Sequence, residues 1–165
     1  MADITFSMIE TNGIQMRVAE AGAGPLVLLV HGWPESWYSW RHQIRGLADS
    51  GYRVIAPDMR GYGDTSSPAA AADYRIDILV ADLVGLLDAL GEEKAALIGH
   101  DWGSMVVWNA ALLYPERFTG VMGMSVPYGG VGAEAPTAGW QKAMGDQFFY
   151  ILYHNEEGGV AESEY

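Results

Sequence analysis

One short segment restricts the fold more than any other: residues 97–104 read Leu-Ile-Gly-His-Asp-Trp-Gly-Ser. The apolar residues 95–98 have the pattern of a buried β-strand, and residues 105–113 have the pattern of a helix. Small residues on both sides of Asp101 permit a sharp strand-to-helix turn that lifts the central side chain out of a sheet. The segment therefore predicts a strand, a tight corner that carries a carboxylate, and a helix.

The rest of the chain repeats this alternation of strands and helices. Strand patterns cover residues 4–9, 14–19, 26–30, 53–56, 95–98 and 121–126, and helical patterns cover residues 38–48, 76–90, 105–113 and 140–153. Asn12-Gly13, between the first two strands, is a strong hairpin signal. Alternation of this kind favours right-handed crossovers. We therefore expect an α/β fold with a mostly parallel sheet that starts as an antiparallel N-terminal hairpin.

The character of the sequence changes after Pro127. Residues 128–139 are rich in Gly, Ala and Pro and have no periodicity, so they are interpreted as a linker before the last helix. We expect residues 1–126 to form the N-terminal part of a core and residues 127–165 a linker with the first part of a second, helical region. Nothing follows the last predicted strand to complete the sheet, so we expect a truncated chain. Its open sheet edge would favour pairing, a homodimer among the alternatives.

Composition excludes several classes of function. The formal net charge is −12 and no run of Lys and Arg offsets it, which argues against nucleic acid as a partner. The chain has no cysteine, so disulfides and thiolate metal sites are excluded. The longest aliphatic run, residues 26–30, is too short to cross a bilayer, and the first five residues do not resemble a signal peptide. We expect a cytoplasmic protein without a membrane partner.

Asp101 is the residue on which the chemistry depends. A carboxylate is ionised at neutral pH and attacks without prior help from a base. It suits displacement at a saturated carbon that bears an epoxide oxygen or a halide, and this displacement forms an ester with the protein. A separate base must then activate water to hydrolyse the ester. Asp is also a common helix N-cap, but the flanking Gly99 and Gly103 favour the nucleophile. No cofactor or metal is required.

A second segment, His31-Gly32-Trp33-Pro34, directly follows the apolar strand at residues 26–30. In folds with such a corner, the loop after this strand supplies one backbone donor of an oxyanion hole. Pro34 restricts Trp33 and can hold its amide inward. The Trp102 amide, at the start of a helix, points toward developing negative charge. We expect the N–H groups of Trp33 and Trp102 to form the oxyanion hole.

Five segments, in this order, resemble the soluble-type epoxide hydrolases of the α/β-hydrolase superfamily. They are residues 31–41, 58–63, 99–103, 114–117 and 149–153. The resemblance implies an α/β-hydrolase fold with a helical cap. It also implies hydrolysis of epoxides to vicinal diols through an ester on Asp101, with a small hydrophobic epoxide and water as substrates. Asp58 and Arg60 are expected to brace the loop after their strand and not to act in catalysis.

The resemblance also assigns roles in the last segment. Tyr150 matches a cap tyrosine that holds the epoxide oxygen and protonates the alkoxide as the ring opens, with Tyr153 as the alternative. A phenol is protonated at neutral pH and is a good donor to an alkoxide. Without the resemblance, either tyrosine is more simply explained by packing on a helix face. The expected substrate pocket consists of Trp33, Pro34, Trp102 and Tyr153.

The chain departs from the family pattern in two groups: the histidine base that activates water, and the acid that orients this histidine. None of its four histidines is where the family places the base, and no carboxylate directly follows the strand at residues 121–126. We expect these groups and a second cap tyrosine beyond Tyr165, in the same chain or in a second piece. Two alternatives stay open: a haloalkane dehalogenase with the same nucleophile, and an inactive hydrolase-like binding or assembly fragment.

Overall fold

The computed structural model describes residues 2–130 and 136–154. The chain divides into two compact units, Met1–Tyr128 and Gly129–Tyr165. The first is built on a β-sheet and is called the sheet unit below. The second contains two helices among its described residues and is called the helical unit.

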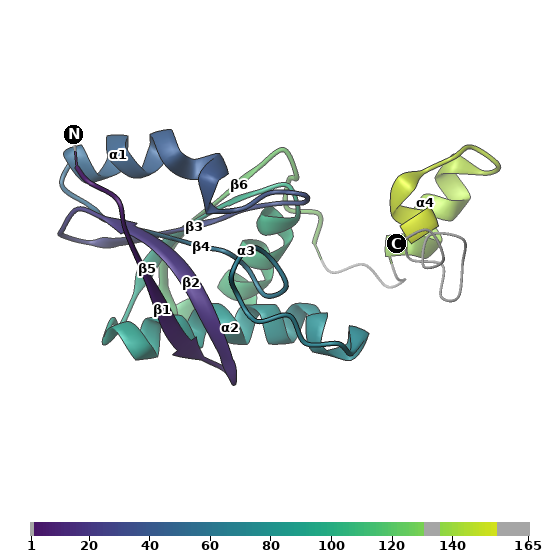
Figure 1. Ribbon diagram of the computed structural model, residues 1–165. Helices are drawn as coiled ribbons and strands as arrows, with labels where there is room; N and C mark the ends of the chain where they lie inside the picture. Colours follow the sequence, from purple (N-terminus) through teal and green to yellow (C-terminus); the bar gives the residue numbers. More distant parts are fainter. Residues whose placement is uncertain (1, 131–135, 155–165) are drawn as a thin grey trace. The chain divides into compact units, whose positions relative to one another are not determined.

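The sheet unit has a six-stranded sheet with the order β1-β2-β4-β3-β5-β6 (Figure 1). The strands are β1 (Thr5–Thr11), β2 (Ile14–Ala21), β3 (Leu26–Val30), β4 (Arg53–Pro57), β5 (Ala95–His100) and β6 (Phe118–Met124). β2 pairs antiparallel with β1 and with β4, whereas β3, β4, β5 and β6 are joined by parallel pairings. The predicted mostly parallel sheet with an antiparallel N-terminal hairpin is confirmed.

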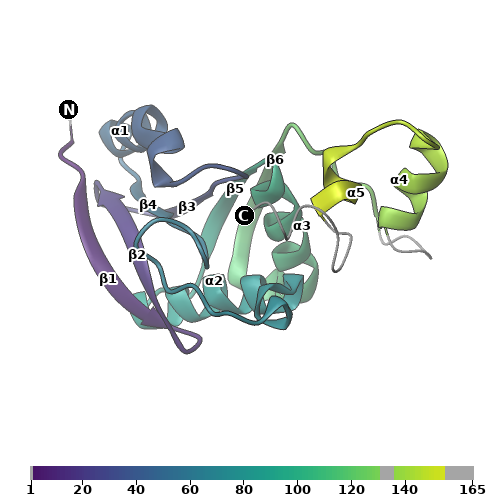
Figure 2. The same cartoon turned by 45° about the vertical axis from the view of Figure 1, so that its right-hand side comes forward.

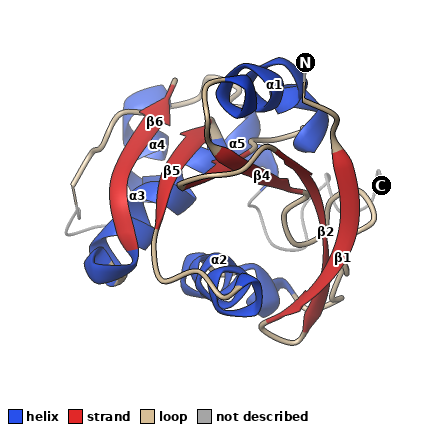
Figure 3. Ribbon diagram, turned by 90° about the vertical axis from the view of Figure 1, so that its left-hand side faces the viewer, coloured by secondary structure: helices blue, strands red, loops and turns tan. Residues whose placement is uncertain are grey.

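Helices cover both faces of the sheet. A short 3-10 helix (Trp37–Trp40) leads into α1 (Arg41–Asp49), which lies on one face, while α2 (Ile76–Leu90) lies on the other (Figure 2, Figure 3). Strand β3 shows why the sheet needs helices on both faces. Its alternate residues pack into two separate cores: Leu26, Leu28 and Val30 join α2 and α3 (Trp102–Leu113), whereas Val27 and Leu29 join α1. Burial on both faces explains the unbroken apolar run of this strand.

Several boundaries in the sheet unit differ from the prediction by one to three residues, and those of β6 and α3 are among them. Strand β6 was expected at residues 121–126 but spans Phe118–Met124, because Phe118 pairs with Ala95 and packs into the core. Ser125, with φ +66°, ends the strand. Helix α3 was expected to begin at Met105 but begins at Trp102.

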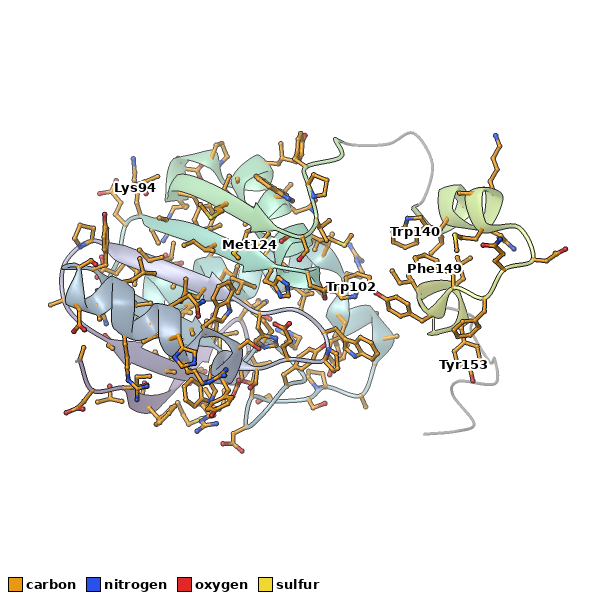
Figure 4. The ribbon with its side chains drawn as sticks, turned by 90° about the horizontal axis from the view of Figure 1, so that it is seen from above. Lys94, Trp102, Met124, Trp140, Phe149 and Tyr153 are labelled. Carbon is orange, nitrogen blue, oxygen red and sulfur yellow. The ribbon has the colours of Figure 1, made fainter. Side chains whose placement is uncertain are left out.

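The prediction of one helix over residues 140–153 was wrong. The helical unit has α4 (Pro136–Met144) and α5 (Tyr150–His154). Gly145 ends α4, with φ +55° and its N–H bonded to Gln141 O at 3.0 Å. The rings of Trp140 and Phe149 then meet edge to face with centroids 5.7 Å apart, which packs the two helices together (Figure 4). The expected linker at residues 128–139 was too long, because α4 already begins at Pro136.

No helix within the described residues has both the length and the apolar character to cross a bilayer.

A buried ion pair fixes the loop that follows β4. The Arg60 guanidinium donates to both carboxylate oxygens of Asp82 on α2, at 2.8 Å and 2.6 Å. Asp82 is fully buried and Arg60 is 5% exposed. The Asn12 side chain in the β1–β2 turn donates to the same carboxylate at 2.8 Å. Hairpin, helix and loop are therefore held by one carboxylate, and the expected bracing role of Arg60 is confirmed.

We predict that Asp82→Ala lowers the free energy of unfolding by about 3–5 kcal/mol, because it leaves the buried Arg60 charge without a partner. The matched control is Asp77→Ala in the exposed pair with Arg75, whose side chains are 51% and 68% accessible. This control should change the free energy of unfolding very little. Urea unfolding of both variants measures the difference, and equal effects would contradict the assignment.

Candidate active site

Asp101 occupies a strained corner between β5 and α3. Its φ of +53° and ψ of −123° are unusual for any residue except glycine. The corner is tight because its two glycines touch other backbone: a Cβ on Gly99 would lie 2.4 Å from Gly103 O, and one on Gly103 would lie 2.2 Å from Val30 O. The Asp101 side chain makes no capping bond to α3. The geometry is that of the predicted turn, and the N-cap interpretation is not supported.

Ser104 fastens this corner to β6. Its fully buried hydroxyl oxygen lies 2.9 Å from Gly99 O and 2.8 Å from Met124 O, and it accepts the Met124 N–H at 3.0 Å. The Asp101 N–H donates to the same Met124 carbonyl at 3.1 Å. Sequence reasoning did not single out Ser104. The available signal was a hydroxyl directly after Gly103, near the start of a buried helix.

The loop after β3 places a backbone donor against the Asp101 carboxylate. The Trp33 N–H donates to Asp101 Oδ1 at 3.0 Å. Gly32 permits this approach, because a Cβ there would lie 2.5 Å from the Cβ of Asp101. The Trp33–Pro34 peptide bond is cis, Pro34 is exposed, and the Trp33 side chain is 44% exposed. The structure therefore brings together Asp101 and Trp33.

Trp102 is the first residue of α3, directly after Asp101. Its N–H has no acceptor within the helix, because the first turn of any helix leaves its N–H groups without intrahelical partners. The side chain is half-buried. The position at a helix start beside the carboxylate is the one the sequence predicts, and a role as the second donor stays a prediction.

A contact between Glu35 and His100 joins the loop after β3 to the corner after β5. Glu35 Oε1 lies 3.0 Å from His100 Nδ1, and Glu35 Oε2 accepts the Gly32 N–H at 3.2 Å. His100 directly precedes Asp101, so this contact ties the two motifs together. Sequence reasoning did not predict this contact. Glu35 follows His31-Gly32-Trp33-Pro34 and His100 precedes Asp101, and the opposite charges that a carboxylate and an imidazole can carry were the available signal.

Two further rings lie near the nucleophile. Burial lowers the pKa of His31, an effect that the Gly32 carbonyl and the charges of Asp58 and Glu35 oppose. The ring of Tyr62 meets that of His31 edge-on, with centroids 4.9 Å apart. Burial raises the pKa of Tyr62, and the negative charge of Asp101 adds to this rise. The phenol of Tyr62 therefore stays protonated within the electrostatic field of Asp101.

Asp58 is fully buried directly after β4, and the hydrogen bond to its carboxylate braces the segment after β3, whereas the sequence predicted a brace for the loop after its own strand. Its Oδ1 accepts the Trp37 N–H at 2.8 Å, and its Oδ2 lies 3.5 Å from the Arg17 guanidinium. Residues 2–130 and 136–154 contain no group of three or more His, Asp or Glu residues that could hold a metal ion.

Tyr150 and Tyr153 lie on α5 in the helical unit, three residues apart and thus on neighbouring positions of one helix face. Tyr150 is 38% exposed and its ring contacts Phe149 at 5.5 Å between centroids. Tyr153 contacts Phe148 at 5.6 Å. The roles of the two phenols toward an epoxide stay predictions.

We predict that Gly32→Ala destabilises the protein by about 1–3 kcal/mol, because the new methyl overlaps the side chain of Asp101. The control is Gly46→Ala in α1, where a Cβ would have nothing within 4 Å. Because alanine favours a helix over glycine, this control should stabilise the protein by up to about 1 kcal/mol. Thermal and urea unfolding measure both changes. A neutral Gly32→Ala would contradict the close contact between loop and corner.

Comparisons with known proteins agree with this geometry. A family profile described as the alpha/beta hydrolase fold matches residues 25–155. Epoxide hydrolase A of Mycobacterium tuberculosis is 51% identical over 162 residues, which cover 97% of this chain and 50% of that protein. Epoxide hydrolase 3 of Siraitia grosvenorii is 46% identical over 166 residues, which cover 100% of this chain and 52% of that protein.

Solved structures are similar as well. The crystal structure of epoxide hydrolase A from Mycobacterium thermoresistibile superposes with a TM-score of 0.93 at 55% identity and covers 98% of this chain and 51% of its own. An epoxide hydrolase from Vigna radiata gives a TM-score of 0.91 at 45% identity, with 98% and 52% covered. The chain thus spans about half the length of the relatives it matches. With the profile match and the geometry of the corner, the chain belongs to the α/β-hydrolase fold family.

Proposed function

We propose that the chain carries the nucleophile of an epoxide hydrolase. The observation that carries the proposal is the Asp101 carboxylate at the strand-to-helix corner, with the Trp33 N–H 3.0 Å from Oδ1. The relatives with the same fold are named epoxide hydrolases and share 45–55% of their aligned residues with this chain. The substrate class is a small hydrophobic epoxide, with water as the second substrate.

In the first step, Asp101 Oδ2 attacks a ring carbon of the epoxide while Oδ1 keeps its bond to the Trp33 N–H. The new carbon–oxygen bond forms an ester, and the ring carbon–oxygen bond breaks with its electron pair on the departing oxygen. That oxygen needs a proton as the pair arrives. Tyr150 supplies it in this proposal, with Tyr153 as the alternative, because a phenol is protonated at neutral pH.

In the second step, a base takes a proton from water as the water oxygen adds to the ester carbon of Asp101, and the electron pair of the ester carbonyl moves to Oδ1 as negative charge. The N–H groups of Trp33 and Trp102 stabilise this oxyanion. Loss of one such donor typically costs about 10²–10³ in rate. Collapse of the intermediate releases the diol and restores the carboxylate. Because Oδ1 is already bonded to Trp33 in the resting state, little reorganisation is needed as the charge develops.

The second step needs a base that activates the water, and histidine is the usual candidate. His31 is bonded on both ring nitrogens, His100 pairs with Glu35, and His42 lies exposed on α1. We infer that the base and the acid that orients it lie in the half of the relatives' length that this chain does not span. On this basis the chain forms the ester but does not hydrolyse it quickly.

The expected pocket of Trp33, Pro34, Trp102 and Tyr153 stays part of the proposal. Trp33 and Pro34 are exposed, so both are accessible to a substrate that approaches Asp101. A cytoplasmic location and a homodimer stay predictions. The haloalkane dehalogenase alternative is not favoured, because the relatives are named epoxide hydrolases. An inactive fragment is not favoured either, because the strained corner and its donor are intact.

We predict that incubation with styrene oxide gives a covalent adduct on Asp101, measured by intact mass spectrometry and located by peptide fragmentation. The mass gain should equal the whole epoxide, because ring opening expels no leaving group. The adduct should accumulate, since His31, His42 and His100 are not placed to act as an efficient water-activating base.

Asp101→Asn is the matched control, because Asn tolerates a positive φ and its amide is a poor nucleophile. It should give no adduct. An alkyl bromide is the second probe: a gain of the alkyl group alone with bromide release, and none with styrene oxide, would indicate a dehalogenase instead. Absence of any adduct on Asp101 with both probes would overturn the proposed function.

A further inference from the structure

The amide that binds Asp101 belongs to a peptide unit that is held at its other end. The Gly32 carbonyl and the Trp33 N–H are parts of one planar group and point in opposite directions. His31 Nδ1 lies 2.8 Å from this carbonyl, and the N–H lies 3.0 Å from Asp101 Oδ1. Because the group is planar, whatever fixes the direction of the carbonyl also fixes the direction of the N–H.

The second ring nitrogen of His31 determines which form of the ring is present. The Met59 N–H donates to His31 Nε2 at 2.9 Å, so Nε2 carries no proton. The Gly32 carbonyl can only accept, so Nδ1 carries the proton. The ring is 3% exposed and is packed against Tyr62. Its two neighbours therefore permit only the neutral Nδ1–H tautomer.

The position of Met59 is fixed by its burial and by its two neighbours. It is buried and lies between Asp58, whose N–H donates to Arg17 O at 2.9 Å, and Arg60, which is paired with Asp82. The ring of His31 thus connects a fixed segment after β4 to a single peptide group after β3, whose carbonyl also accepts the Glu35 N–H at the longer distance of 3.3 Å.

We propose that His31 is a positioning residue that aims the Trp33 amide at Asp101. It acts only as the neutral Nδ1–H tautomer, braced against the Met59 N–H. A bond accepted by the Gly32 carbonyl also polarises the peptide group and makes its N–H a stronger donor. The catalytic consequence rests on the proposed function, whereas the geometric consequence does not.

The brace has a pH dependence. Protonation of the ring would place an N–H on Nε2 against the Met59 N–H, two donors face to face. The groups that act on the ring are its burial, which lowers the pKa and has the largest effect, and the Gly32 carbonyl and the carboxylates of Asp58 and Glu35, which raise it. The pKa therefore lies below the ordinary value of 6.5. Stability linked to this group is complete above that value and is lost as the pH falls toward the lowered pKa.

The first test needs no substitution and no substrate. Nitrogen-15 NMR of the chain reads the ring tautomer and the Trp33 amide during a pH titration. At neutral pH, Nδ1 should be protonated and Nε2 should not. The Trp33 amide resonance should move with the same midpoint as the His31 ring, below the ordinary value. An Nε2–H tautomer, or a Trp33 amide that does not follow the ring, would overturn the proposal.

The second test uses two variants of His31, each of which keeps one of its two hydrogen bonds, either to the Gly32 carbonyl or from the Met59 N–H. In His31→Asn the side-chain amide N–H replaces the Nδ1–H donor to the Gly32 carbonyl. In His31→Gln the side-chain oxygen replaces the Nε2 acceptor for Met59. Alkylation by styrene oxide should slow about tenfold in His31→Gln, the equivalent of one hydrogen bond, and less than about threefold in His31→Asn.

The Trp33 amide resonance should shift in His31→Gln and stay near its original position in His31→Asn. A purely structural role predicts equal slowing in both variants, in proportion to their loss of stability in urea, and would contradict the proposal. If the unsubstituted chain forms no adduct, the proposed function fails, while the tautomer and the Trp33 titration still decide the role of His31.

Discussion

The hydrogen bond from the Trp33 N–H to the Asp101 carboxylate depends on two strands that lie side by side. β3 and β5 pair in parallel, with Leu28 opposite Leu97 and Val30 opposite Gly99. Their carboxyl ends therefore meet at one edge of the sheet, and the loop after β3 and the corner after β5 emerge next to each other. Gly32 and Gly103 then allow backbone to approach more closely than any side chain would permit.

The surrounding structure serves to keep this bond in one geometry. Ser104 fixes the corner to β6, and Glu35 ties the loop to His100. The loop after β4 is fixed in turn by the buried pair of Arg60 and Asp82. A carboxylate held in a strained conformation persists only where its neighbours determine its position. The pairing of Arg60 with Asp82 on α2 thus also fixes the neighbouring Met59, whose N–H contacts His31.

Much of this was predictable because the signals are local. The apolar run of β3 and the stripe of α2, ended by Gly91 with φ +70°, were placed to the residue, and the small residues around Asp101 predicted its corner. The break at Gly145 was missed, because a single glycine also occurs within helices. The contacts of Glu35 with His100 and of Arg60 with Asp82 were not specified, because they join distant segments that leave no local periodicity.

A crystal structure of the chain after reaction with styrene oxide measures the central interaction most directly. The ester carbonyl oxygen of Asp101 should lie about 2.7–3.1 Å from the backbone nitrogens of Trp33 and Trp102, the range in which donors stabilise an oxyanion. An ester whose carbonyl points away from both nitrogens, or an adduct on another residue, would contradict the assignment of Asp101 as a nucleophile aimed by backbone donors.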